Sequence, residues 1–187
     1  MMSLNSSENK PDFVHIVSVE DHTQHKAKLL YYIDQMIEEQ DIDLNEKGYY
    51  YDFNIPKAHR PYKQLFKDIT YPYLQTFAQT LGCNFSRMSS VWFQQYMQGS
   101  DFGWHQHGGH FAVVYYVELP DPNEATEFLQ YGKFNVKEGD LLIFPTFMVH
   151  RSPEIKSNKR KTIIATNVYF EVDREVIEKH GKQHFRN

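Results

Sequence analysis

The sequence changes in character near Gly82, and this change constrains the fold more than any other feature. Before it, apolar residues recur at steps of three and four, which is the period of an amphipathic helix. After it, short runs of β-branched and aromatic residues alternate with Gly, Pro, Asn and Asp, a pattern typical of antiparallel strands and turns. We therefore expect a mainly β protein with flanking helices (α+β), in which the helices pack on the outside of an antiparallel barrel or sandwich.

Residues 20–40 and 61–81 are the two expected helices, because in each the apolar residues fall on one face. Gly82 is a suitable stop for the second helix. Pro72 lies inside that helix and predicts a kink or a division. Between the helices, the aromatic-rich residues 48–55 predict a strand.

The C-terminal half predicts a series of short strands. They are expected at residues 88–97, 111–119, 126–131, 141–144 and 162–170. Residues 173–187 predict a short helix with a frayed end. A chain of 187 residues has the length of one ordinary domain, so residues 1–187 are expected to form a single domain.

Composition argues against several classes of partner. The net charge is −4 and the longest basic run is the three residues 159–161, so no broad electrostatic surface for nucleic acid is expected. No apolar run approaches the roughly 18 residues of a membrane span, and the polar start of the chain predicts a cytoplasmic protein. The single cysteine, Cys83, allows neither an internal disulfide nor a cysteine metal cage, and we expect it to pack after the second helix.

Three histidines have a pattern that suits metal binding. His105 and His107 lie two apart in a Gly-rich stretch, and residues at that spacing in an extended segment point to the same side. His150 follows a later apolar run, and three ligands on one side of an ion leave the opposite positions for substrate and oxygen. A His-x-His pair alone is also common on surfaces. His110 is expected beside the site rather than on the metal. The remaining histidines are expected in solvent: His15, His22, His25, His59, His180 and His184.

Three sequence segments share features with a known family. Residues 96–99 (YMQG) precede the first histidine pair, residues 114–117 (VYYV) form an apolar strand with two tyrosines, and residues 139–145 (GDLLIFP) lead to the distal histidine. Over residues 91–170 the chain resembles the iron(II)/2-oxoglutarate-dependent oxygenases, in particular the prolyl 4-hydroxylase-like branch and small phage-type oxygenases. The resemblance implies a double-stranded β-helix, a cupin-like jelly roll with its core at about residues 84–172. It also implies iron(II) at His105, His107 and His150, with 2-oxoglutarate and O2 as cosubstrates.

The same resemblance implies a pocket for 2-oxoglutarate. Arg160 stands where the family has a basic residue for the distal carboxylate, which a guanidinium meets with two parallel hydrogen bonds. Tyr116 would donate a further hydrogen bond, and Tyr96 and Thr162 are weaker candidates for the same pocket. Lys161 is the alternative to Arg160, because the sequence does not settle which side of the strand each residue takes.

One position departs from the family pattern. The common motif has Asp or Glu where this chain has His107, giving two imidazoles and one carboxylate. A neutral third ligand leaves more net positive charge on the metal and alters its redox tuning, so the use of 2-oxoglutarate is a separate question from the metal site. The nearest acids, Asp101 and Glu118, are not two residues from His105 and are not recruited as ligands.

Three functional hypotheses follow. The leading one is a 2-oxoglutarate-dependent hydroxylase. The second is a cupin-like three-histidine dioxygenase or isomerase without 2-oxoglutarate, which is weakened because Pro145 is not followed by the cupin Pro-x-Gly pattern before the last histidine. The third is a β-barrel module that binds a partner without catalysis. The substrate, a peptide or a small molecule, and the oligomeric state are open, and residues 45–60 and 121–125 are expected to form the mouth of the site.

Overall fold

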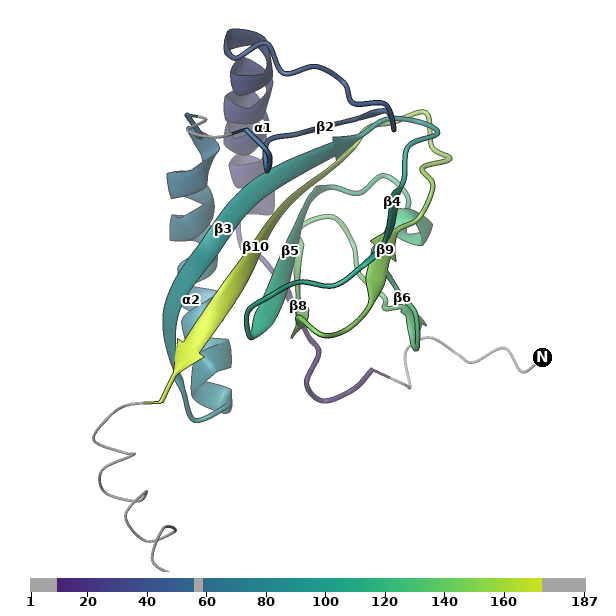
Figure 1. The fold of residues 1–187 in the computed structure, drawn as a ribbon. Helices are drawn as coiled ribbons and strands as arrows, with labels where there is room; N and C mark the ends of the chain where they lie inside the picture. Colours follow the sequence, from purple (N-terminus) through teal and green to yellow (C-terminus); the bar gives the residue numbers. More distant parts are fainter. Residues whose placement is uncertain (1–9, 56–58, 173–187) are drawn as a thin grey trace, which may run out of the picture.

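The computed structural model of the protein describes residues 10–55 and 59–172, which form two antiparallel sheets, two α-helices and a short 3₁₀ helix, η1 (Pro122–Glu124) (Figure 1). The larger sheet has the strand order β1-β8-β5-β10-β3-β2, and the smaller has the order β4-β9-β6-β7. The strands of the larger sheet are β1 (His15–Ser18), β2 (Tyr49–Tyr51), β3 (Asn84–Tyr96), β5 (Phe111–Glu118), β8 (Asp140–Pro145) and β10 (Lys161–Glu171). Those of the smaller sheet are β4 (Phe102–His105), β6 (Glu127–Phe128), β7 (Gly132–Lys133) and β9 (His150–Ser152).

Both expected helices are confirmed. They are α1 (His22–Glu39) and α2 (Tyr62–Thr80), and α2 continues through Pro72 without being divided. Both lie on the same side of β3 and β10, away from β4 and β9 (Figure 1). Their apolar faces and one face of the larger sheet share a buried cluster, which includes Leu29, Phe66 and Tyr115. The helices therefore cover the outer face of the larger sheet.

A second buried cluster fills the space between the two sheets. It includes Tyr116, Leu142 and Ile163 from the larger sheet and Phe128 from the smaller one. Because side chains alternate along a strand, neighbours such as Tyr115 and Tyr116 belong to different clusters. Each central strand is buried on both faces, which explains the nearly continuous apolar runs in the sequence.

The strand predictions hold for the central strands and fail at the edges. The expected strand at 48–55 is limited to β2, and that at 126–131 is limited to β6. The strands β1, β4, β7 and β9 were not predicted, because two- to four-residue strands carry too little periodicity to be recognised. Cys83 packs against the helix-side cluster, as expected. The helix expected at 173–187 lies outside the described residues.

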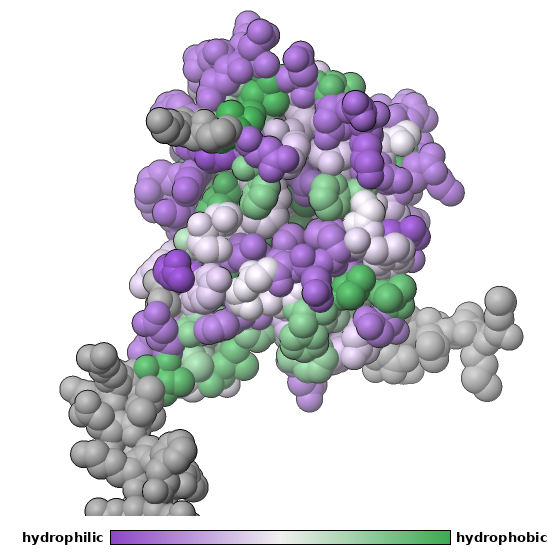
Figure 2. Space-filling model, in the orientation of Figure 1, coloured by the Kyte–Doolittle hydropathy of each residue, from purple (hydrophilic) through white to green (hydrophobic). Residues whose placement is uncertain are grey.

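Within the described residues, no helix is long and apolar enough to cross a bilayer. On the face seen in Figure 2, apolar residues occur in small patches between hydrophilic ones. Exposed apolar residues scattered in this way are normal for a protein surface.

Candidate metal centre

The pairing of two short strands brings the three histidines together. His105 ends β4 and His150 begins β9, and these two residues are direct partners across the antiparallel ladder. His107 follows two positions after His105, and its backbone N–H donates to the Thr146 carbonyl at 3.1 Å. One ligand atom from each imidazole lies within 4.8 Å of the other two, and the three form a group that could hold a metal ion.

Backbone contacts orient two of these rings. Nδ1 of His105 donates to the Gly103 carbonyl at 2.8 Å, and Nδ1 of His150 donates to the Met148 carbonyl at 2.8 Å. Each Nε2 is then left with a free lone pair, which is the form in which histidine binds a metal. Nε2 of His150 lies 3.2 Å from Nε2 of His107. Lone pairs that face one another at this distance suit a cation held by all three rings.

Burial keeps these imidazoles neutral. It lowers the pKa of His150 to about 3 and, together with the neighbouring His105, lowers the pKa of His107 to about 4. The pKa of His105 is also lowered by burial. Ligands that are already deprotonated at neutral pH release no protons when a metal binds. The residues present therefore fit a transition-metal ion such as iron(II).

The histidines open into a cavity of about 480 Å³. Its volume lies within the range of small-molecule sites. The cavity is lined by Tyr51, Phe53, Asn54, Trp92, Gln94, Tyr96, Phe102, His105, Gln106, His107, Gly108, Val114, Thr126, His150, Arg151, Ser152, Lys161, Ile163, Ala165 and Asn167. Tyr51, Phe53 and Asn54, which belong to the expected mouth at residues 45–60, line this cavity. Residues 121–125 do not, and Asp121, Asn123 and Glu124 line a neighbouring cavity instead.

A buried lysine occupies the same cavity. Lys161 is 1% exposed, and its Nζ donates to the Glu124 carbonyl at 2.6 Å and to Ser152 Oγ at 2.7 Å. The ammonium also lies 4.7 Å from the centre of the Tyr96 ring. Burial lowers the pKa of Lys161 to about 7. The buried Glu124 carboxylate offsets part of this lowering, and a bound anion would add a further counter-charge.

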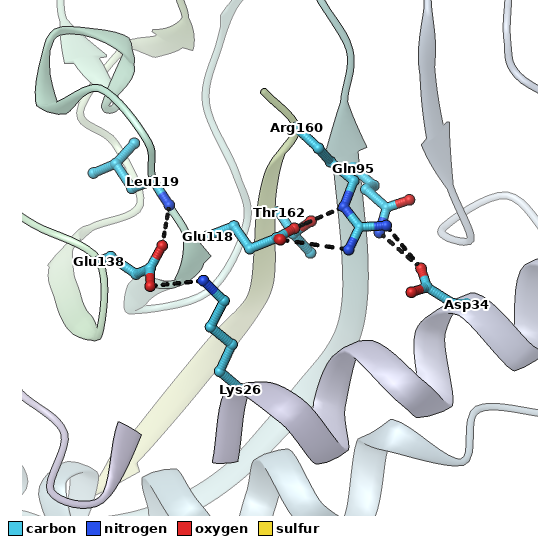
Figure 3. A network of polar contacts seen from close by, with 8 residues as sticks. All are labelled: Lys26, Asp34, Gln95, Glu118, Leu119, Glu138, Arg160 and Thr162. Carbon is cyan, nitrogen blue, oxygen red and sulfur yellow. Dashed lines mark hydrogen bonds and ion pairs between the residues drawn. The ribbon is translucent and has the colours of Figure 1, made fainter. Parts of the chain in front are cut away.

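Arg160 does not lie with the histidines, contrary to the expectation from the sequence. Its Nε donates to Glu118 Oε2 at 2.8 Å and its Nη1 donates to Asp34 Oδ1 at 3.0 Å, on the helix side of the larger sheet (Figure 3). Arg160 immediately precedes β10, whereas Lys161 is the first residue of that strand. Of these two neighbouring cations, Lys161 is the one that lines the cavity.

Of the other expected pocket residues, one lines the cavity and two do not. Tyr96 lines the cavity, whereas Thr162 lies on the face of Arg160 and donates to Glu118. Tyr116 is fully buried behind the cavity wall, and its hydroxyl donates to Thr126 Oγ1 at 2.9 Å. Thr126 rather than Tyr116 is thus exposed to the cavity.

The remaining histidines have other environments. His110 accepts a hydrogen bond from the Phe170 N–H at 3.1 Å and packs on Tyr169, apart from the cluster. The expectation of solvated rings is wrong for two residues. His15 stacks on Phe77, and Nδ1 of His22 lies 2.7 Å from the Tyr115 hydroxyl. His25 is partly buried and His59 is exposed, while His180 and His184 lie outside the described residues.

Sequence reasoning missed several cavity residues. Ser152 could have been found, because it lies two positions after His150 and alternation in a strand puts both on one side. Phe53 and Trp92 carried no such signal. They meet only because the segment after β2 folds over β3, where the two rings lie 5.1 Å apart between centroids.

The fold resembles that of solved 2-oxoglutarate-Fe(II) oxygenases, including prolyl hydroxylases. No protein-family model matches the chain, and a search of curated protein sequences found no significant match.

Three of these structures illustrate the likeness. A viral collagen prolyl hydroxylase from Paramecium bursaria Chlorella virus-1, in complex with 2-oxoglutarate, has a TM-score of 0.61 at 13% identity, covering 90% of this chain and all 100% of that one. The α-ketoglutarate-dependent carbocyclase SnoK from nogalamycin biosynthesis has a TM-score of 0.65 at 11% identity, covering 99% and 94%. HygX from Streptomyces hygroscopicus, solved with nickel, 2-oxoglutarate and hygromycin B, has a TM-score of 0.58 at 8% identity, covering 82% and 81%. At these identities the likeness concerns the fold.

Proposed function

We propose that this chain is an iron(II)-dependent oxygenase that uses 2-oxoglutarate and O2 to hydroxylate an organic substrate. One observation carries the proposal: a buried lysine and three neutral imidazoles line the same cavity. That combination suits 2-oxoglutarate, a dianion whose keto acid end chelates a metal while its far carboxylate requires a fixed cation. Neighbouring structures that contain 2-oxoglutarate, or nickel and 2-oxoglutarate, support this proposal.

In this proposal His105, His107 and His150 hold the metal. Iron(II) bound there, with 2-oxoglutarate as electron donor, would supply the activation of dioxygen for hydroxylation. The protein's part is to keep the three imidazoles neutral by burial and to leave coordination positions open toward the cavity.

Lys161 takes the role that the sequence suggested for Arg160. Its ammonium, held by Ser152 Oγ and the Glu124 carbonyl, would pair with the distal carboxylate of 2-oxoglutarate. Because burial lowers the pKa of Lys161 to about 7, the arriving carboxylate would raise that pKa and keep the lysine protonated. Tyr96 would form the adjoining wall through its ring.

We further propose that the two sheets form a double-stranded β-helix within a single domain, with its core at residues 84–172. Residues from both sheets in one buried cluster support this arrangement. The single cysteine fits a reducing, cytoplasmic compartment.

A second candidate is a three-histidine dioxygenase or isomerase that does not use 2-oxoglutarate. His107 favours it, since an imidazole replaces the carboxylate of the common ligand set. In this case Lys161 would bind an anionic group of the substrate itself.

Anaerobic titration of the iron(II)-loaded protein with 2-oxoglutarate tests both candidates. We expect saturable binding with a weak visible charge-transfer band, because a chelated keto acid gives such a band. Succinate, which lacks the keto group, is the control and should give no band. Iron binding without a band would favour the second candidate. Failure to bind iron(II) at all would exclude both.

A further inference from the structure

The cavity has two ends of different chemistry, which lie at different positions along β10. Lys161, Ile163, Ala165 and Asn167 all face the cavity. At about 3.3 Å per residue, Lys161 and Asn167 are about 20 Å apart along the strand. Across the ladder, Lys161 is paired with Tyr96, and Ala165 with Trp92. The end near Trp92 is therefore distant from the lysine.

The metal centre lies beside the Trp92 end. The rings of Trp92 and His107 have centroids 5.7 Å apart. Phe53 meets Trp92 edge to face at 5.1 Å and is 51% exposed, so one of its faces is available to a ligand. Exposed aromatic faces of this kind bind flat rings through stacking or edge contacts.

The rest of this end is polar without charge. Asn54, Gln106 and Asn167 line it with amide groups. The charged residues among the described cavity walls are Lys161 and Arg151. The guanidinium of Arg151 is already held by Glu127 at 2.8 Å, and it stacks on Trp104. In the proposed function, 2-oxoglutarate would balance the charge of a metal ion at the three histidines. An ionised substrate would then find no free counter-charge among the described residues near Trp92.

One atom at this end is in need of a donor. Oδ1 of Asn167 is buried and has no hydrogen-bond partner among the described residues. A buried carbonyl oxygen without a partner costs about 1–3 kcal/mol. A ligand N–H or O–H that reached this oxygen would remove that penalty.

We propose that the substrate of this cavity is an uncharged small molecule with an aromatic or other flat ring, bound against Phe53 and Trp92, with a polar hydrogen donated to Asn167. This inference rests on the proposed function, because it names what the same cavity would oxidise. The cavity volume of about 480 Å³ suits one small molecule beside the cosubstrate.

Fluorescence of a single tryptophan tests the proposal. The chain has two tryptophans, so the Trp104→Phe variant leaves Trp92 as the reporter inside the cavity. The metal-free variant is titrated with benzamide, with its isosteric cation benzamidine, and with acetamide, which lacks the ring. We expect benzamide to change the Trp92 emission saturably and to bind at least tenfold more tightly than the other two. Equal or tighter binding of benzamidine or acetamide would overturn the proposal.

Variants locate the contacts. Phe53→Ala and Asn167→Leu should each weaken benzamide at least fivefold. Tyr31→Ala removes an exposed aromatic of α1 that does not line the cavity, and it should have no effect. An unchanged affinity in both cavity variants would overturn the proposal. Thermal unfolding of each variant identifies any that fails to fold. Asn167→Asp, which keeps the size and the acceptor oxygen and adds a negative charge, then serves as the second test. It should shift the preference from benzamide toward benzamidine, and an unchanged preference would overturn the contact with residue 167.

Benzoate completes the series. It is measured in the Lys161→Met background, where the lysine cannot attract it, and there it should bind more weakly than benzamide. Tighter binding of benzoate would overturn the claim that the ligand is uncharged. Because the titrations need neither iron nor 2-oxoglutarate, the two proposals fail separately. Loss of 2-oxoglutarate binding with the benzamide pattern intact refutes the proposed function alone, and the reverse result refutes this inference alone.

Discussion

Replacement of Lys161 by methionine is the sharpest test of how the cavity would recognise 2-oxoglutarate. Methionine has a similar length and no charge, and it can occupy the same buried space. The lysine is 1% exposed, so its pairing with a carboxylate would be desolvated. Removal of one partner from a buried pair costs about 3–5 kcal/mol.

The lowered pKa of Lys161 reduces this expected loss of binding free energy. With a pKa of about 7, Lys161 is mostly deprotonated slightly above neutral pH in the free protein, and its protonation then costs about 1 kcal/mol. The net loss in Lys161→Met is therefore about 2–4 kcal/mol, or roughly 30-fold to several hundred-fold in affinity. Affinity of the unmodified protein should also fall as the pH rises above about 7, because the lysine must gain a proton to bind the anion. The variant should lose this pH dependence.

Isothermal titration of the anaerobic iron(II) protein with 2-oxoglutarate measures both effects. Arg160→Met is the matched control, since it removes the neighbouring cation on the opposite face of β10. It should leave the affinity within about twofold of the unmodified protein. If Arg160→Met weakens binding and Lys161→Met does not, the assignment of the two faces is refuted. Iron affinity should be unchanged in both variants.

The remaining predictions concern the metal and the scaffold. His150→Ala should abolish iron(II) binding in a metal titration while the circular dichroism spectrum is kept, whereas His107→Asp should still bind the metal through the commoner ligand set. The pKa of His107 is lowered to about 4 and that of His150 to about 3, so metal affinity should change little between about pH 8 and pH 6. Imidazoles of ordinary pKa would lose metal affinity over this range. A steep loss of metal affinity there would contradict the burial of the two rings. Arg160→Met should lower the free energy of unfolding by about 1–2 kcal/mol in urea, because Glu118 loses its cation. Asp52→Ala should lower the free energy of unfolding by about 3 kcal/mol or more. The fully buried Asp52 carboxylate accepts a hydrogen bond from Arg60 at 2.6 Å and anchors the segment that carries Phe53. A change below about 1 kcal/mol would contradict this role.

The helices and central strands could be predicted because their patterns are local. A period of three to four residues defined α1 and α2, and runs of β-branched and aromatic residues defined β3, β5, β8 and β10. The short strands could not be predicted in the same way. β4 and β9 exist because each supplies hydrogen-bond partners to the other, which is a property of two segments distant in the sequence.

In the candidate site, too, some features were predictable from the local sequence and others were not. The spacing of His105 and His107, with a distal His150, led to the prediction that the three rings share a metal, and the structure brings these rings together. The cavity cation was not decided at that level, because Arg160 and Lys161 are adjacent cations and a shift of one residue exchanges the two faces of a strand.

The sequence by itself determined which residue types are present and their local periods: two amphipathic helices, a β-rich second half, three histidines and a pair of adjacent cations. Only the tertiary structure decided which of these side chains share a cavity. The pairing of β4 with β9 set His105 opposite His150, and the pairing of Lys161 with Tyr96 turned the lysine inward and Arg160 toward Glu118. The physical reason is that strand register depends on hydrogen bonds to neighbouring strands, including the irregularity between Thr162 and Ile163, and no local pattern encodes those partners.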